Sequence, residues 1–207
     1  MKKKEQAQEP AVEIKSVEYE TQAIEETANI LFKPNPGPQT DFLAASEREV
    51  LYGGSAGGGK SYAMLSDPLR YMGHPAFSGL LLRHTTEELR ELVFKSQELY
   101  PKIWPGIKWS ERKMQWTAPS GARLWMSYLD RDDDVLRYQG LAFSWIGFDE
   151  LTQWATPYAW NYMRSRLRST APDLPIYMRA TTNPGGRGHH WVKKMFIDPA
   201  PYNRAYD

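Results

Sequence analysis

The stretch that decides the predicted fold is Leu51-Tyr52-Gly53-Gly54-Ser55-Ala56-Gly57-Gly58-Gly59-Lys60-Ser61. Residues 54–61 fit the pattern G-x-x-x-x-G-K-[ST], in which a glycine-rich loop surrounds phosphate groups. Glycine tolerates positive φ and carries no Cβ, so the backbone N–H groups of such a loop can turn toward an anion. The β-prone run 49–52 enters the loop, and residues from Lys60 onward can form a helix whose N-terminus favours negative charge. This order of strand, loop and helix favours a phosphate site over a flexible Gly/Ser linker.

Every residue of this loop is therefore a candidate contact of a nucleotide. Lys60 is expected to reach the β- and γ-phosphates as a point charge. The Ser61 hydroxyl is expected to hold Mg²⁺. The remaining candidates would contribute backbone contacts, and they are Gly54, Ser55, Ala56, Gly57, Gly58 and Gly59.

A second candidate for chemistry is the run 143–150, in which an apolar segment ends in Asp149 and Glu150. Two acids at a strand end are common and are often only solvated. Downstream of a phosphate-binding loop, however, they indicate the other half of a hydrolytic site, in which Asp149 positions Mg²⁺ and Glu150 polarises the attacking water. GTPases position water with a glutamine from elsewhere, so a glutamate directly after the aspartate favours an ATPase.

Two further runs end in polar residues that could join this site. Arg83 ends the apolar run 78–83, at the edge where α/β sheets bind ligands. It is either a phosphate-sensing group or a member of an ordinary ion pair. The run 175–183 ends in side chains that could touch the γ-phosphate or its water, or could simply end a strand, and they are Thr181, Thr182 and Asn183.

Gln39 lies a short way upstream of the loop, after a proline-rich stretch and at the start of a predicted helix. Its amide can both donate and accept hydrogen bonds, as adenine recognition requires. A surface glutamine at a helix start is the alternative.

The remaining pattern alternates strands and helices. Residues 85–88 resemble a capping box before a helix with apolar residues at helical spacing. Residues 116–128 are predicted to form two strands around a Pro-Ser-Gly turn, and the aspartates of 130–134 a solvated loop. A helix from about Thr156 is expected to end in the basic run 164–168. There Arg166 and Arg168 could suit the helix dipole, face DNA phosphates or act on a neighbouring subunit.

Composition bounds the class of protein. The 207 residues allow one α/β domain and little more, and 41% hydrophobic residues support a core. The absence of cysteine excludes disulfides and thiolate metal sites, and a net charge of +1 gives no information about partners. No apolar run reaches the ~20 residues of a membrane span, and the basic start is not followed by an apolar segment. We expect a soluble protein.

In this order, these segments resemble the ATPase half of the large terminase subunit of tailed bacteriophages. The resemblance covers residues 32–200. It rests on runs that follow one another in the order of the family's motifs: 38–39, 54–61, Arg83, 148–152, 166–168, 181–186 and 188–196. It implies an α/β fold of the P-loop NTPase class (ASCE type), with a mostly parallel central sheet flanked by helices.

The resemblance also assigns roles. It implies ATP and Mg²⁺ as cofactors, adenine recognition around Gln39, and Mg²⁺ ligation by Ser61 and Asp149. It makes Glu150 the catalytic carboxylate, with Lys60 on the phosphates, and residues 181–183 the segment that couples hydrolysis to movement. A trans-acting arginine would be Arg137, Arg166 or Arg168, and the sequence does not choose among them.

The family implies its partners too: double-stranded DNA, the portal protein, the small terminase subunit and other copies of the chain in a pentameric ring. It implies a protein of the host cytoplasm that docks on the viral procapsid and touches no membrane. The family continues into an RNase H-like nuclease, whereas this sequence stops at Asp207, so we expect ATP hydrolysis without DNA cleavage.

We expect residues 1–30 to be flexible or loosely docked and residues 31–207 to form the ATPase domain. A helicase-like DNA-dependent ATPase and a nucleotide-dependent assembly module are the alternative functions.

Overall fold

A computed structural model describes residues 32–55, 57 and 59–199. The chain divides into two compact units, Met1–Lys33 and Pro34–Asp207. The expectation of a flexible segment at residues 1–30 concerns residues outside the described part. The sheet and the helices that cover it belong to the second unit.

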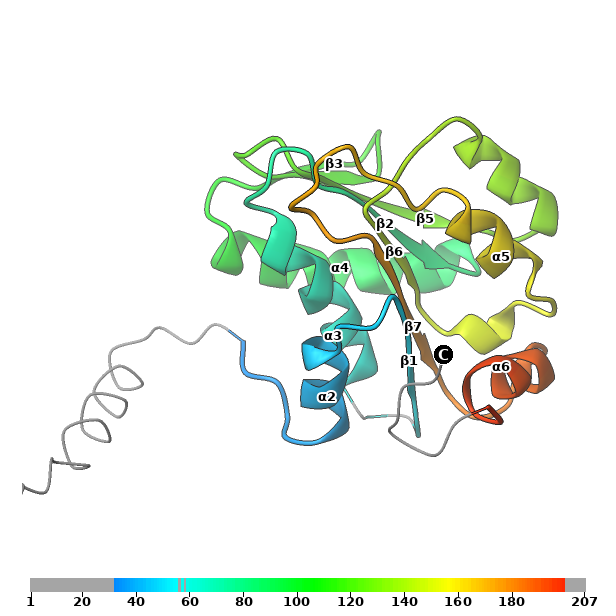
Figure 1. The fold of residues 1–207 in the computed structure, drawn as a ribbon. Coiled ribbons are helices and arrows are strands. Elements are labelled where there is room, and N and C mark those ends of the chain that lie inside the picture. The colour runs from blue at the N-terminus through cyan, green and yellow to red at the C-terminus, as the bar shows by residue number, and fades with distance from the viewer. Residues whose placement is uncertain (1–31, 56, 58, 200–207) are drawn as a thin grey trace, which may run out of the picture. The chain divides into compact units, whose positions relative to one another are not determined.

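A seven-stranded sheet in the order β1-β7-β6-β2-β5-β4-β3 forms the centre of this unit (Figure 1). The first five strands of that order are parallel, and β4 and β3 extend the sheet in antiparallel pairing. The mostly parallel sheet expected from the sequence is confirmed, and β3 was not predicted. The strands are β1 (Glu49–Gly53), β2 (Ser78–Arg83), β3 (Lys108–Ser110), β4 (Gln115–Thr117), β5 (Arg123–Tyr128), β6 (Trp145–Phe148) and β7 (Tyr177–Thr182).

Helices cover both faces of the sheet (Figure 1). One apolar cluster joins α2, α3 and α4 to one face, and a second joins α5 and α6 to the other. The helices are α2 (Pro38–Ala44), α3 (Lys60–Ser66), α4 (Thr86–Ile103), α5 (Tyr158–Arg164) and α6 (His189–Phe196), with short 3₁₀ helices η1 (Asp67–Tyr71), η2 (Asp132–Tyr138) and η3 (Leu151–Gln153).

The buried strands have the composition that two covered faces require. Leu80 and Leu82 belong to the cluster under α5, whereas Leu81 belongs to the cluster under α4, and all three are fully buried. A continuous apolar run of this kind is typical of a parallel strand packed on both sides. The capping box before α4 is also confirmed, because Thr85 Oγ1 accepts from Glu88 N and Thr85 N donates to the Glu88 carboxylate.

One local expectation was wrong. Helix α5 ends at Arg164, and the basic run does not continue it, because Leu167 is buried in a parallel bridge with Phe143. Burial of Leu167 against the sheet outweighs the weak helical preference of the run.

The solvated surface segment expected at 130–134 is confirmed, because Asp130, Asp132 and Asp133 are exposed. The start of η2 lies in this segment, and there the Asp134 carboxylate accepts from two backbone N–H groups. Within the described part of the chain, no helix is long and apolar enough to cross a membrane.

Candidate nucleotide site

The carboxyl ends of β1, β7 and β6 bring the predicted site residues to one edge of the sheet. Gly53, which precedes the glycine-rich loop, is paired with Thr182 of β7. Phe148, which precedes the acidic pair, is paired with Ala180 of the same strand. The three motifs therefore follow neighbouring strands, although up to 130 positions separate them along the chain. This is the edge at which open α/β sheets bind ligands.

The glycine-rich loop has the backbone that the motif requires. Gly57 and Gly59 have φ values of 85° and 72°, and Gly59 leads directly into α3. A Cβ built on Gly57 would have no atom within 4 Å, so the loop borders open space there. Lys60 is buried, and its Nζ donates to the carbonyl oxygens of Gly54 (3.1 Å) and Ser55 (2.6 Å). The ammonium group is thus held at the start of the loop. Ala56 and Gly58 lie outside the described residues.

Gln39 supports this loop from α2. Its Nε2 donates to Gly59 O at 2.9 Å, and its Oε1 accepts from Asn35 N at 2.6 Å. The side chain is 3% exposed, and a Cβ on Gly59 would lie 2.7 Å from Nε2. Both functional groups of the amide are therefore occupied within the chain, and adenine recognition by Gln39 stays a prediction.

Asp149 is fully buried at the end of β6. Thr181 Oγ1 donates to its Oδ1, and Arg83 Nε lies 3.3 Å from its Oδ2 in an ion pair. Burial raises the pKa of Asp149, and the Arg83 charge opposes that shift. Oδ2 has no hydrogen-bond partner among the described residues. A buried carboxylate oxygen that accepts no hydrogen bond is chemically suited to a hard cation such as Mg²⁺, which would here replace the Arg83 guanidinium as its ionic partner. Arg83 contacts this aspartate, and its predicted contact with a phosphate stays a prediction.

Glu150 has an unusual backbone and is held by Asn183. Its φ and ψ are 60° and 55°, a left-handed conformation that costs a non-glycine residue about 1–2 kcal/mol. Asn183 donates from its backbone N (3.1 Å) and its Nδ2 (2.8 Å) to the two carboxylate oxygens. Burial raises the pKa of Glu150, and the hydrogen bond from the Asn183 backbone opposes that shift. The strained turn thus directs this carboxylate toward Asn183, while the carboxylate of Asp149 bonds to Thr181.

The segment after β7 packs against the turn that follows Glu150. Thr182 Oγ1 donates to Thr152 Oγ1 at 2.7 Å, and Gly188 N donates to Thr152 O at 2.7 Å. Trp191 of α6 donates from Nε1 to Trp154 O at 2.8 Å. No role was predicted for Thr152 or Trp154. Their partners in the segment after β7 are at least 30 positions away, so no local pattern could have identified these contacts.

The three candidate trans-acting arginines lie at two different edges. Arg137 Nη2 donates to the carbonyl oxygen of Tyr128, the last residue of β5, so Arg137 lies toward the edge of the glycine-rich loop. Arg166 and Arg168 flank Leu167, whose bridge to Phe143 precedes β6, so they lie at the amino ends of the strands. A role in a neighbouring subunit stays a prediction for all three.

Among the described residues, no group of three or more His, Asp or Glu side chains is arranged to hold a metal ion. A metal at this site would therefore depend on the nucleotide and on isolated protein oxygens. Asp149 Oδ2 is such an atom.

The glycine-rich loop between β1 and α3, the acidic pair after β6 and the mostly parallel sheet define a P-loop NTPase of the ASCE type. The family described as terminase large subunit, T4-like virus type, N-terminal, matches residues 51–204. The chain belongs to this family.

Solved structures share the fold. The large terminase of a thermophilic bacteriophage is 19% identical, with a TM-score of 0.59 and coverage of 80% of this chain and 43% of its own. A variant of the large terminase ATPase domain of Thermus phage P74-26 is 15% identical, with a TM-score of 0.59 and coverage of 83% and 72%. The N-terminal domain of the DNA packaging ATPase of bacteriophage phi29 is 16% identical, with a TM-score of 0.53 and coverage of 77% and 85%.

The chain spans less than half the length of the first of these proteins. That terminase has also been solved in complex with ADP and with ATP-γ-S. No curated protein matches the chain.

Proposed function

We propose that this chain is the ATPase domain of a DNA-packaging motor, which binds ATP with Mg²⁺ and hydrolyses it to move double-stranded viral DNA into a procapsid. The observation that carries the proposal is the position of Glu150: its carboxylate is held by Asn183, which directly follows β7, the neighbour of β1 in the sheet. Family membership and the ATP-γ-S complex of the thermophilic phage terminase support the choice of nucleotide.

In this proposal the loop and the buried aspartate bind the substrate. Lys60 leaves the carbonyl oxygens of Gly54 and Ser55 for the phosphates, because a charge-assisted bond to phosphate is stronger than a bond to a neutral carbonyl. Ser61 and Asp149 hold Mg²⁺, which neutralises charge on the phosphates when it is bound. Asp149 Oδ2, which accepts no hydrogen bond, fits that role if Mg²⁺ replaces Arg83 as its ionic partner.

Glu150 is the proposed base. A base works best when its pKa approaches the working pH, and burial shifts the pKa of Glu150 upward in that direction. Asn183 orients the carboxylate through two hydrogen bonds, so it sets the direction in which Glu150 accepts a proton from water.

Residues 181–188 are the proposed path from hydrolysis to movement. Asn183 contacts Glu150, and Gly188 at the start of α6 contacts Thr152 in the same turn. A shift of Glu150 and of the turn after it would therefore displace residues 183 and 188, and α6, which begins after Gly188, would move with them.

The proposed partners are double-stranded DNA, the portal protein, the small terminase subunit and neighbouring copies in a ring, which would supply Arg137, Arg166 or Arg168 in trans. The proposed location is the host cytoplasm, with docking on the procapsid. An arginine finger is worth about 10³–10⁵ in rate, so turnover by dilute protein should be slow and should rise steeply with protein concentration.

Two substitutions test the hydrolytic site. Lys60→Ala should abolish ATP binding, while Lys102→Ala, an exposed lysine of α4, should not. Glu150→Gln should bind ATP normally and lose turnover by about 10²–10⁴, the usual worth of a general base. Glu98→Gln, an exposed glutamate of α4, is the matched control. Turnover by Glu150→Gln equal to that of the parent would remove Glu150 from the mechanism.

The same variant separates the alternative functions. If Glu150→Gln still supports DNA packaging in a complementation assay, hydrolysis is incidental and the chain is an assembly module. If the parent chain separates DNA strands without a portal partner, the helicase-like function is favoured.

A further inference from the structure

At the edge opposite the nucleotide site, three neighbouring strands begin with polar residues on the same face of the sheet. Arg123 begins β5 and is paired with Ser78, which begins β2. Ser144 precedes β6, and its Oγ accepts from Ser78 N. By strand alternation, Ser78 shares the face of Leu80, and Ser144 shares the face of Ile146. Because neighbouring strands lie about 4.8 Å apart, the three side chains form a short row.

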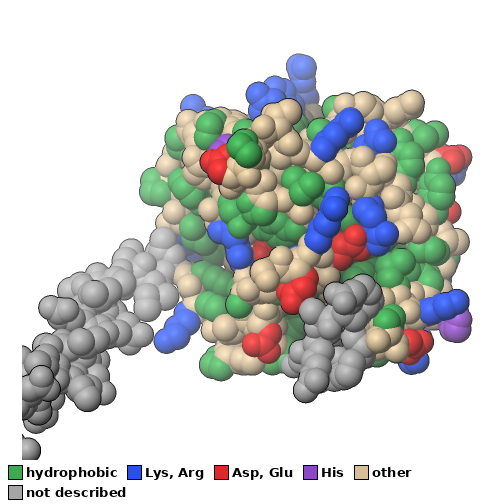
Figure 2. Space-filling model, in the orientation of Figure 1, with side chains coloured by type: hydrophobic (Ala, Val, Ile, Leu, Met, Phe, Trp, Pro, Cys, Tyr) green, Lys and Arg blue, Asp and Glu red, His purple; other side chains and the backbone are tan. Residues whose placement is uncertain are grey.

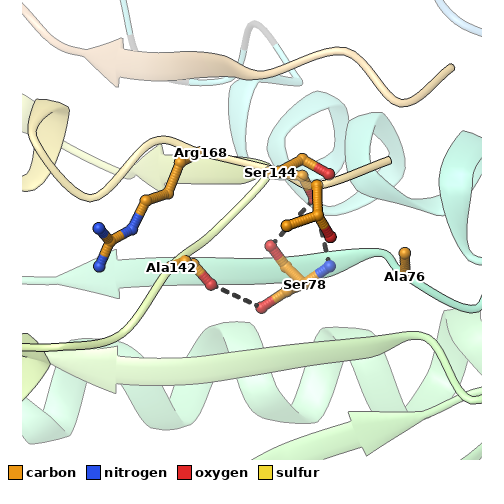
Figure 3. A pocket seen from close by; sticks show the side chains of 7 residues that line it. Ala76, Ser78, Ala142, Ser144 and Arg168 are labelled. Carbon is orange, nitrogen blue, oxygen red and sulfur yellow. Dashed lines mark hydrogen bonds between the residues drawn. The ribbon is translucent and has the colours of Figure 1, made fainter. Parts of the chain in front are cut away.

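A groove of about 440 Å³ lies over the two serines of this row (Figure 3). Arg123 does not line the groove and is paired with Ser78 on the neighbouring strand. The lining of the groove has one charged side chain and four hydroxyl groups: Ala76, Ser78, Ala142, Ser144, Arg168, Ser169 and Thr170. In Figure 3, Arg168 stands at one end of the groove and Ala76 at the other, with Ser78 and Ser144 between them. The segment that carries Arg168 is placed here by the bridge of Leu167 to Phe143.

Of the residues described, Arg168 is the one charged side chain that lines the groove, and the groove and its border hold spare donors. No carboxylate lines it. The Arg168 guanidinium has one hydrogen-bond partner in the described part of the chain, Leu141 O at 3.2 Å, and Arg123 is exposed with no side-chain partner there. The hydroxyl groups of Ser78 and Ser144 donate to backbone carbonyls at 3.2 Å, which is long for an O–H···O bond.

The surroundings are basic as well. Lys108 begins β3 at the same level of the sheet as Arg123, because both pair with Thr117. Arg166 lies two residues before Arg168, in the turn that follows α5, and its guanidinium lies over the Tyr162 ring. In Figure 2, Lys and Arg side chains gather along the upper rim, where Figure 1 places the segment between α5 and β7. The acidic residue nearest to Arg168 in the sequence is Asp173, and its Oδ2 lies 3.2 Å from Nε2 of His74.

We propose that this groove binds the sugar–phosphate backbone of double-stranded DNA, with Arg123 and Arg168 on phosphate oxygens and the serine hydroxyls exchanging their long bonds for charge-assisted ones. Guanidinium and hydroxyl groups are the usual donors to DNA phosphates. The choice of DNA over another polyanion rests on the proposed function.

The position explains how one domain can hold both ligands. Strands β6 and β7 run from the groove to the nucleotide edge, and the step from Ser144 to Asp149 spans about 17 Å at about 3.3 Å per residue. DNA at one end of the strands does not compete with ATP at the other. A substitution that removes binding of one ligand should therefore leave binding of the other ligand intact.

The test measures binding of a short DNA duplex by fluorescence anisotropy over a series of salt concentrations. For the double variant Arg123→Ala/Arg168→Ala, we expect the slope of log K against log salt to fall by about two, because each phosphate contact contributes about 0.9. Arg168→Lys keeps the charge and should keep its share of the slope. Arg90→Ala, an exposed arginine on α4 at the other face of the sheet, is the matched control. The thermal unfolding midpoint, measured on the same samples, should not change.

Three outcomes separate this inference from the proposed function. Unchanged slope and affinity in the double variant would overturn the groove and leave DNA binding elsewhere on the chain. A parent chain that hydrolyses ATP but binds no duplex at low salt would overturn the groove and leave the ATPase intact. Loss of the slope in a chain that hydrolyses no ATP would support the groove and overturn the proposed ATPase.

Discussion

Replacing Gln39 with glutamate distinguishes two roles for this side chain, a brace for the glycine-rich loop and a reader of adenine. The carboxylate keeps an acceptor for Asn35 N, which now bonds to Oε1 at 2.6 Å. It removes the donor that lies 2.9 Å from Gly59 O and puts a negatively charged oxygen in its place. Gln39→Glu therefore disturbs the last glycine of the loop without changing the size of the side chain.

The magnitude follows from one lost bond in a buried place. Leaving a buried carbonyl without its donor costs about 1–3 kcal/mol. If that cost falls on the loop conformation that binds phosphate, nucleotide affinity drops by about 5- to 150-fold, since 1.4 kcal/mol is tenfold. Gly59 belongs to a loop expected to contact phosphates, which ATP and GTP share. We therefore expect the same loss for both nucleotides.

Competition of ATP and GTP against a fluorescent nucleotide measures the two affinities on one protein sample. Gln97→Glu, an exposed glutamine of α4, provides the same chemical change away from the site and should leave both affinities unaltered. The thermal unfolding midpoint of each variant, measured without nucleotide, shows that the fold is retained.

Two results would refute this reasoning. A loss of ATP affinity with GTP affinity unchanged would mean that the Gln39 amide leaves Asn35 and Gly59 to read the base. Unchanged affinity for both nucleotides would mean that the bond to Gly59 does not contribute to the binding conformation of the loop.

Three further substitutions test other contacts. Asn183→Ala removes the Nδ2 bond to the proposed catalytic glutamate, and a bond to a charged group is worth about 1.5–3 kcal/mol. We therefore expect kcat to fall by about 10- to 150-fold with little change in KM. Steady-state kinetics that show only a KM effect would contradict this. Gly147→Ala places a Cβ 2.3 Å from the Trp145 ring. Overpacking costs about 1–3 kcal/mol, which should lower the thermal unfolding midpoint by about 2–4 °C per kcal/mol. An unchanged midpoint would count against the packing described. Asp67→Asn leaves the buried guanidinium of Arg179 without its carboxylate and should cost about 3–5 kcal/mol in denaturant unfolding, whereas a loss below 1 kcal/mol would show that this ion pair is dispensable.

The nucleotide edge was predictable because its signals are local. The loop motif requires a strand before it and a helix after it, and β1 and α3 stand in those places. Asp149 and Glu150 follow an apolar run, which marks a strand end without reference to the rest of the chain. The same holds for Thr85 and Glu88, which form a capping box from four consecutive residues.

The contacts that orient these groups were not predictable in the same way. The bond from Asn183 to Glu150 joins residues 33 positions apart, and the bond from Gln39 to Gly59 joins residues 20 positions apart. The sequence indicated Gln39 as a possible adenine reader, but its burial and its two partners depend on how α2 docks beside the loop.

The sequence by itself therefore determined the position of the glycine-rich loop between β1 and α3 and of the acidic pair after β6. Tertiary structure alone decided that Glu150 is held by Asn183, and that Arg137 lies toward the nucleotide edge while Arg166 and Arg168 lie at the opposite edge. The physical reason is the order of the strands. Local propensity makes a strand, but which strands become neighbours depends on burying both faces of the sheet at once, a property of the whole chain.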